Sequence, residues 1–283
     1  MHLTGIIAGL PQGTAMSDSV LLARRGALAE ITLNRPQVHN AFDDALVAAL
    51  QTALGEAAAD EHVRYVLLTG AGKSFSAGAD LNWMRGMARA NEAENRADSL
   101  RLAALMRTLN FFPKPTIARV NGAAYGGGVG LVACCDIAIG VQGAKFSLSE
   151  VKLGLVPAVI SPYVIAAIGA RHARRLFITG EIFEAEHAAR IGLLHEAVAP
   201  EELDVAVDRA VHFLSKGGPQ AQREAKQLAL RVGGLGTDAA VALDEQNAGL
   251  IARLRVSEEG QHGIGAFLDK RAPRWATQET ENS

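Results

Sequence analysis

Two glycine-containing loops and one glutamate are the residues of this sequence best suited to chemistry. Residues 76–81 (SAGADL) and 121–128 (NGAAYGGG) each follow a strand-like run and lead into helical sequence. Small residues let a ligand approach the backbone closely, and free N–H groups at a helix start stabilise negative charge. Either loop alone is explained as a tight turn. Taken together with Glu150, the pair favours an oxyanion hole.

Other known catalytic and cofactor-binding motifs are each excluded by a single mismatched residue in this sequence. Leu67 stands where a phosphate-binding P-loop requires a glycine, and Leu131 interrupts the dinucleotide-binding glycine pattern. Ser74 occupies the glycine position of a nucleophile elbow around Ser76. No histidines or cysteines have the spacing of a zinc site. We therefore expect no metal, flavin or nicotinamide cofactor.

The elements that must position these residues alternate between strands and helices. Residues 65–69, 116–120 and 136–140 are short strand-like runs, each followed by a glycine-containing loop, and residues 65–69 read as a buried strand. Apolar residues recur at helical spacing from Ala41 onward and again in residues 95–110. This alternation predicts an α/β architecture.

The two ends of the chain differ from this central region. Residues 20–23 and 27–33 flank Gly26 and predict a β-hairpin. Residues 1–15 read as an N-terminal extension without ordered structure, so the core is expected over residues 16–200. From residue 201 to 283 the strand signal is absent, which predicts a helical C-terminal region that serves as a lid, a subunit interface or a packing layer.

Composition excludes several classes of partner. The 283 residues are 49% hydrophobic, enough for a large core, and the net charge of -2 gives no field that attracts nucleic acid or an anionic membrane. The N-terminal residues lack the basic segment of a secretion signal. Only Cys134 and Cys135 are present, and adjacent cysteines rarely form a relaxed disulfide. A reducing, cytoplasmic compartment is expected.

Beyond these patterns, the sequence resembles the enoyl-CoA hydratase/isomerase family, the crotonases, from about residue 20 to residue 275. The matching motifs occur in order, and they are Leu33-Asn34-Arg35-Pro36 with Asn40-Ala41, Phe75-Ser76-Ala77-Gly78-Ala79-Asp80-Leu81, Asn121-Gly122 with the triple glycine, Cys135-Asp136-Ile137-Ala138, Glu150 with Leu153-Gly154-Leu155-Val156-Pro157, and Ala266-Phe267-Leu268-Asp269-Lys270-Arg271. The resemblance implies a spiral of ββα units and a C-terminal helical region that forms a homotrimer or a hexamer of two trimers.

The resemblance also assigns the site. It implies that the backbone N–H groups of Ala77 and Gly127 form the oxyanion hole and that Glu150 transfers protons on an acyl-CoA substrate. Coenzyme A enters only as part of that substrate. The residues that the resemblance places against coenzyme A are Gln37, Val38, His39, Ala79, Asp80, Leu81 and Lys270.

One departure from the family pattern leaves the reaction open. Hydratases of straight-chain enoyl-CoAs carry a second glutamate just beyond the triple glycine, where this chain has Gly130. Acid and base catalysis then falls on Glu150, with Tyr125 as a neighbour that could hold a water. The segments 79–84 and 149–162 resemble hydratases of branched, carboxylated substrates such as 3-methylglutaconyl-CoA. Double-bond isomerisation and acyl-CoA binding without catalysis are the alternatives.

A carboxylated substrate also requires a group that binds its free end. The sequence offers Lys152, Arg85 or a residue of a neighbouring subunit for this role. It does not distinguish among them.

Overall fold

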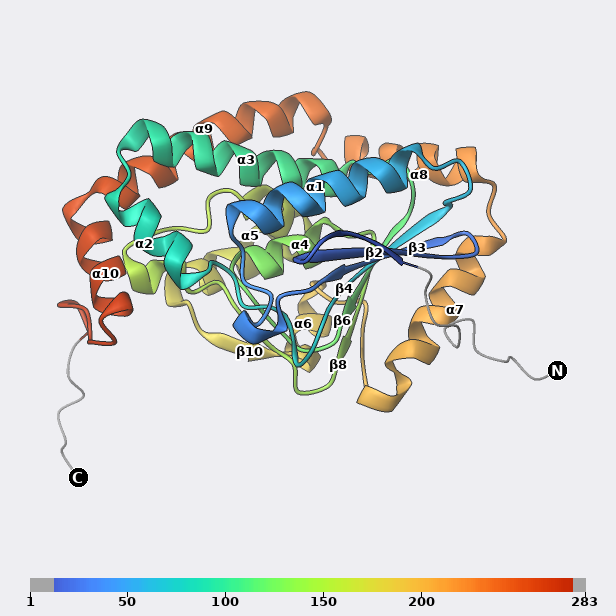
Figure 1. The fold of residues 1–283 in the computed structure, drawn as a ribbon, viewed down its shortest axis with the longest axis horizontal. Coiled ribbons are helices and arrows are strands. Elements are labelled where there is room, and N and C mark those ends of the chain that lie inside the picture. The colour runs from blue at the N-terminus through green and yellow to red at the C-terminus, as the bar shows by residue number, and fades with distance from the viewer. Residues whose placement is uncertain (1–12, 277–283) are drawn as a thin grey trace.

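The protein's structure, a computed structural model, describes residues 13–276 and is built around two β-sheets. The large sheet has seven strands in the order β1-β2-β3-β4-β6-β8-β11 (Figure 1). These strands are β1 (Gly13–Ser17), β2 (Val20–Arg25), β3 (Leu28–Leu33), β4 (Tyr65–Gly70), β6 (Thr116–Val120), β8 (Ile137–Val141) and β11 (Glu196–Val198). The β1–β2 and β2–β3 pairs are antiparallel, whereas every pair from β3 to β11 is parallel.

The small sheet consists of four three-residue strands that the sequence patterns did not predict. They are β5 (Ser74–Ser76), β7 (Ala123–Tyr125), β9 (Lys145–Ser147) and β10 (Ile182–Glu184), in the order β10-β9-β7-β5. Strands β5, β7 and β9 follow β4, β6 and β8 in the chain. The predicted strand-loop-helix rhythm is therefore a ββα repeat in its first two turns, and the α/β fold with ββα units is confirmed.

Both faces of the large sheet are buried, which explains the continuous apolar runs of its central strands. Along β4, Val66 and Leu68 pack into the main core, while Tyr65 and Leu67 pack into a second cluster beneath α7. Figure 1 shows α1 and α3 over one face of the sheet and α7 on the other. The helices up to residue 202 are α1 (Asp44–Ala59), α2 (Leu81–Arg89), α3 (Glu92–Asn110), α4 (Gly127–Cys134), α5 (Ser161–Thr179) and α6 (Ala185–Ile191), with 3-10 turns η1 (Pro36–Val38), η2 (Ser149–Leu153) and η3 (Pro200–Glu202).

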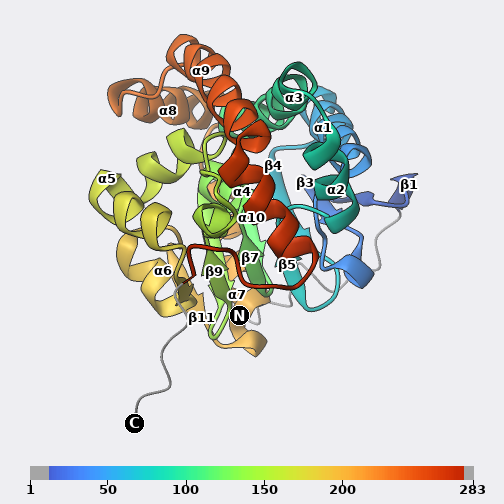
Figure 2. The same ribbon diagram turned by 90° about the vertical axis from the view of Figure 1, so that its left-hand side faces the viewer.

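The C-terminal region is helical, as predicted. It comprises α7 (Leu203–Ser215), α8 (Pro219–Val232), α9 (Thr237–Val256) and α10 (Glu258–Leu268). Helix α9 packs along α3, and α10 packs against α2 and η2 (Figure 2). The contact with η2 is close, because a Cβ at Gly263 would lie 2.3 Å from the carbonyl oxygen of Leu153. No helix within residues 13–276 is long and apolar enough to cross a membrane.

The ends of some elements differ from the sequence predictions. The first helix begins at Asp44 rather than Ala41, because the side chain of Asp43 accepts a hydrogen bond from the N–H of Leu46 and caps the helix. Strand β1 includes residues 13–15 of the expected extension, and residues 1–12 lie outside the described residues. Cys134 ends α4, Cys135 follows it, and both are buried free thiols.

Candidate active site

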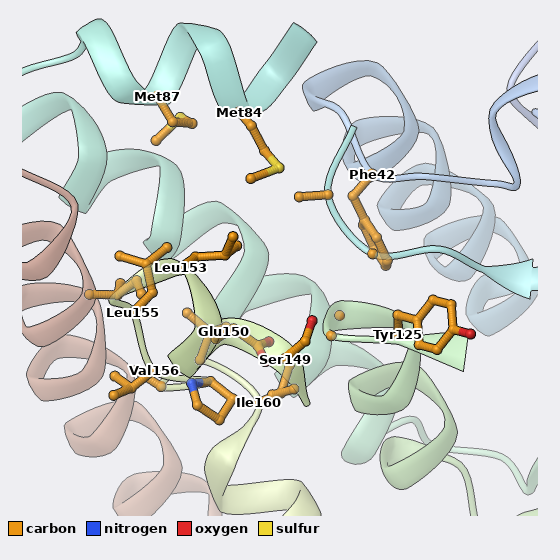
Figure 3. Close-up of a pocket in the computed structure, with 18 of the residues that line it drawn as sticks. Phe42, Met84, Met87, Tyr125, Ser149, Glu150, Leu153, Leu155, Val156 and Ile160 are labelled. Carbon is orange, nitrogen blue, oxygen red and sulfur yellow. The ribbon is translucent and has the colours of Figure 1, made fainter. Parts of the chain in front are cut away.

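A cavity of about 290 Å³ lies between the two glycine loops, η2 and the C-terminal helices. Ala77, Gly127 and Glu150, which the sequence analysis placed in the catalytic site, all line it. Figure 3 shows the carboxyl group of Glu150 among side chains that are mostly apolar. The apolar side chains around it include Phe42, Met84, Met87, Leu153, Leu155 and Ile160. The cavity therefore suits a hydrocarbon chain with one titratable group at its reactive end.

The two loops meet backbone to backbone, which explains their small residues. Strands β5 and β7 pair in parallel and carry the loops side by side. A Cβ at Gly78 would lie 3.0 Å from the carbonyl oxygen of Tyr125, and one at Gly128 would lie 2.6 Å from the carbonyl oxygen of Ser76. Only glycine at position 128 permits this approach without displacement of the neighbouring backbone, and Gly78 also has a φ of +82°.

Hydrogen bonding in the first loop contradicts one predicted role. The N–H of Ala77 donates to the carbonyl oxygen of His39 at 2.9 Å, so it is not available to a substrate. Phe42 then bridges the next residues, because its N–H donates to Gly78 and its carbonyl oxygen accepts from the N–H of Asp80. The N–H of Ala79 lies between these two bonds, on the opposite side of the strand-like segment. It has no acceptor within residues 13–276, and Ala79 lines the cavity.

The second loop presents a helix N-terminus to the same cavity. The N–H of Gly126 donates to the carbonyl oxygen of Ser147 at 3.0 Å, and Gly126 has a φ of +48°. Gly127 is the first residue of α4, so its N–H has no partner in the helix. The helix dipole adds partial positive charge at this point. Ala79 and Gly127 therefore line the cavity, one from each loop, with N–H groups that can stabilise an oxyanion.

Glu150 faces these donors from η2. A Cβ at Gly126 would lie 3.1 Å from Oε1 of Glu150, which places the carboxyl group directly beside the second loop. Its other oxygen, Oε2, is buried and has no hydrogen-bond partner among the described residues. Burial raises the pKa of Glu150 to about 7, although a backbone N–H partly opposes the shift. A carboxyl group with this pKa can both accept and return a proton near neutral pH.

The second acid of the family pattern has no substitute at Gly130. A Cβ at Gly130 would lie 2.3 Å from Cγ2 of Ile160 and 3.3 Å from Cε of Met106. Apolar side chains thus occupy the space that a side chain at position 130 would need. Figure 3 also shows the hydroxyl end of Tyr125 pointing away from Glu150, so the predicted water-holding role of Tyr125 is not supported.

Comparisons with known proteins agree with this geometry. The family described as Enoyl-CoA hydratase/isomerase matches residues 23–278. The chain belongs to this family.

Individual relatives match over nearly the whole chain. An enoyl-CoA hydratase of Shewanella pealeana has a crystal structure with 43% identity and a TM-score of 0.74, covering 91% of this chain and 96% of that one. The Short-chain-enoyl-CoA hydratase of Clostridium acetobutylicum is 33% identical over 256 residues, 90% of this chain and 96% of the relative. The 2,3-dehydroadipyl-CoA hydratase of Escherichia coli is 33% identical over 260 residues, 90% of this chain and 98% of the relative.

Most residues that the enoyl-CoA hydratase/isomerase resemblance placed against coenzyme A lie outside the cavity. Gln37 and His39 are exposed, and Val38 is half-buried beside them in the loop that receives the N–H of Ala77. Leu81 and Lys270 are exposed and do not line the cavity. Their contacts with coenzyme A stay predictions.

The side chain of Asp80 has a structural role in this enoyl-CoA hydratase/isomerase fold. Asp80 is buried and caps α2 by accepting hydrogen bonds from the N–H groups of Asn82 and Trp83. It also pairs with Arg35 at 3.1 Å. These contacts turn its carboxylate into the protein, so a contact of Asp80 with coenzyme A would have to come from its backbone and stays a prediction.

Sequence reasoning missed Arg255, which lines the cavity from α9. The sequence of α9 contains a signal for it. Asp244, Ala248 and Ile251 are buried, and Arg255 continues their spacing of three or four residues along the same face. A charged residue on the buried face of an amphipathic helix indicates either a buried ion pair or a functional site.

Proposed function

We propose that this enoyl-CoA hydratase/isomerase family member adds water across the 2,3 double bond of an enoyl-CoA. In this proposal the N–H groups of Ala79 and Gly127 bind the thioester oxygen, and Glu150 moves both protons. The observation that carries it is the buried carboxyl group of Glu150, with its raised pKa, in the same cavity as two unpaired N–H donors.

The chemistry balances with one carboxyl group. Glu150 as carboxylate takes a proton from water while the water oxygen bonds to C3, and the electrons of the double bond move through C2 onto the thioester oxygen. The two N–H donors stabilise that enolate oxygen, and losing one such donor typically costs about 3 kcal/mol in the transition state. The protonated Glu150 then gives its proton to C2. The carboxylate is regenerated, and the product carries one added water.

For the acyl group we propose a branched chain with a terminal carboxylate, of which 3-methylglutaconyl-CoA is an example. The motifs at residues 79–84 and 149–162 support this choice. The Escherichia coli relative is named for 2,3-dehydroadipyl-CoA, which also carries a terminal carboxylate, so the fold accommodates this chemistry in a protein of similar sequence.

Double-bond isomerisation is the second candidate, and the filled space at Gly130 favours it. Ile160 and Met106 leave no room for a second acid, and isomerisation needs only one group that removes a proton and returns it at another carbon. The water in the hydratase scheme must then be held by Glu150 and backbone groups.

Mass spectrometry distinguishes these reactions. 3-Methylglutaconyl-CoA and crotonyl-CoA are each incubated in deuterated water with the protein and with Glu150→Gln. Addition of one water by the native protein and not by the variant supports hydration. Deuterium incorporation without added water supports isomerisation. If neither substrate changes, hydration of these acyl groups is rejected and acyl-CoA binding without catalysis becomes the better account.

A further inference from the structure

We propose that Arg255 binds a carboxylate at the far end of the acyl group and thereby determines substrate specificity. This inference rests on the proposed function and deepens it, because it names the residue that distinguishes a dicarboxylic acyl-CoA from a monocarboxylic one. The sequence analysis considered Lys152 and Arg85 for this task. The structure places a different cation in the cavity wall.

The charged residues that line the cavity differ in how they can act. Glu150 lies beside the second glycine loop and is assigned to proton transfer. Lys152 is exposed, and its Cε lies 3.2 Å from the position of a Cβ at Gly180, which places its chain against the surface of that turn. Arg85 does not line the cavity and donates to Asn82. Arg255 is the remaining charged residue among the described residues that line the cavity.

Three side chains of α3 hold Arg255 in place through one nitrogen. Its Nη1 lies 3.2 Å from Oδ2 of Asp98, 3.3 Å from Oγ of Ser99 and 3.4 Å from Oδ1 of Asn95. Within residues 13–276 neither Nε nor Nη2 has a partner, and neither is sealed from solvent. The guanidinium group is therefore oriented by the protein while two of its nitrogens stay available to a ligand.

The carboxylate that pairs with Arg255 also pairs with a second cation. Asp98 lies 3.1 Å from Arg101, and Arg101 in turn pairs with the exposed Asp44 at 3.0 Å. Burial lowers the pKa of Arg255 and raises the pKa of Asp98, because loss of hydration disfavours the charged form of each side chain. A second carboxylate next to Arg255 would offset part of this penalty.

The surroundings indicate which ligand would reach Arg255. Ile251, Leu102 and Phe267 line the same cavity and offer only carbon atoms to a ligand. A polar acyl chain would lose its hydration there without compensation, whereas a hydrocarbon chain would not. Guanidinium groups bind carboxylates through two parallel hydrogen bonds. The geometry therefore points to an acyl group that is apolar along its length and carboxylated at its end.

Binding measurements test this without depending on catalysis. Calorimetry compares glutaryl-CoA with pentanoyl-CoA, and adipyl-CoA with hexanoyl-CoA, so that each pair has one chain length. For at least one pair, we expect the native protein to bind the carboxylated ligand tenfold more tightly or better. Arg255→Met should bring that ratio close to one while changing the affinity for pentanoyl-CoA and hexanoyl-CoA less than threefold.

Arg101→Met is the matched control, because Arg101 shares Asp98 but does not line the cavity. It should leave the ratio unchanged. Should Arg255→Met fail to fold because Asp98 loses one of its two cation partners, the double variant Arg255→Met/Asp98→Asn also removes this buried negative charge and is measured instead.

Two results would overturn the inference. One is a native ratio near one at both chain lengths, and the other is an equal loss of affinity for both members of a pair in the Arg255 variant, as a purely structural link between α9 and α3 would give. A failure of the proposed function is seen separately, as the absence of added water with every enoyl-CoA, and leaves the binding ratio to be judged on its own.

Discussion

Glu150 determines how the activity should depend on pH. Its carboxyl group must be ionised to take a proton from water, and burial raises its pKa to about 7. We expect kcat/KM to rise as the pH increases through about 7 and then to level off, in contrast to the acidic midpoint of an exposed glutamate. Initial rates of hydration from pH 5 to pH 9 measure this. A profile that is flat down to pH 5 would contradict the role of Glu150 as base.

The raised pKa of Glu150 increases activity as the pH rises, but it decreases the stability of the folded protein over the same range. Below pH 4.5 the Glu150 side chain is protonated in both states, while between about 4.5 and 7 the unfolded chain releases a proton that the folded chain retains. The folded protein therefore loses stability as the pH rises through this window, by up to about 3 kcal/mol. Glu150→Gln lacks this penalty. Urea unfolding of both proteins at pH 5, 6, 7 and 8 should show the stability of the variant, relative to the native protein, growing with pH. A constant difference would mean that the pKa is not raised.

Gly130 stands where the family pattern has a second acid, and its lack of a side chain also allows the core to pack closely. Gly130→Ala places a methyl group against Ile160, and overpacking of this kind costs about 1 to 3 kcal/mol. Ile160→Ala removes the Cγ2 atom that a methyl group would meet. Thermal unfolding should show that the double variant is more stable than the sum of the two single effects predicts. Simple additivity would mean that Ile160 does not fill this space.

At the scale of elements, the start of α2 connects the fold to the oxyanion site. Asp80 caps this helix, pairs with Arg35 and directly follows Ala79 in the chain. Asp80→Ala should lower the free energy of unfolding by about 2 kcal/mol through loss of the cap and the ion pair, and should reduce kcat/KM at least tenfold because the Ala79 peptide is no longer fixed.

Asn91→Ala is the control for this prediction. Asn91 caps α3 in a capping box but, unlike Asp80 with Ala79, it has no adjacent residue that lines the cavity. Its loss should cost about 1 kcal/mol of stability with little change in kcat/KM. Equal effects of the two substitutions on kcat/KM would show that Asp80 contributes stability alone.

Sequence patterns predicted the long elements and the glycine loops, but not the details that decide the chemistry. Residues 65–69 (YVLLT) are mostly apolar and residues 116–120 (TIARV) contain three apolar residues, and both strands were predicted within one residue. The strands of the small sheet have only three residues each, too few for a periodic signal. The choice between the N–H groups of Ala77 and Ala79 depends on which one His39 accepts. That pairing joins residues 38 positions apart in the chain and has no local signature.

For the whole molecule, α8 supports the expected oligomer. Within the described chain none of the residues of α8 is buried, and Leu228 and Val232, one turn apart, are 51% and 77% exposed. An apolar stripe of this kind is typical of a subunit contact. We expect light scattering to give about 89 kDa for a trimer, three times the 29.8 kDa of one chain, or twice that value for a hexamer. Val232→Glu should shift the mass toward one chain, and a native mass of 29.8 kDa would exclude the trimer.

The buried cysteines have a practical consequence for following ligand binding. Cys134 and Cys135 are the only thiols of the chain, and burial raises the pKa of Cys135 to about 12 and that of Cys134 well above its usual value. Thiol reagents react with the ionised form, so the native protein should be almost inert to maleimides. A cysteine introduced at Leu81, which is 49% exposed at the start of α2, would then be the single reactive thiol. Because Leu81 is a predicted contact of coenzyme A, a fluorophore attached there would test for that contact without removal of either native cysteine.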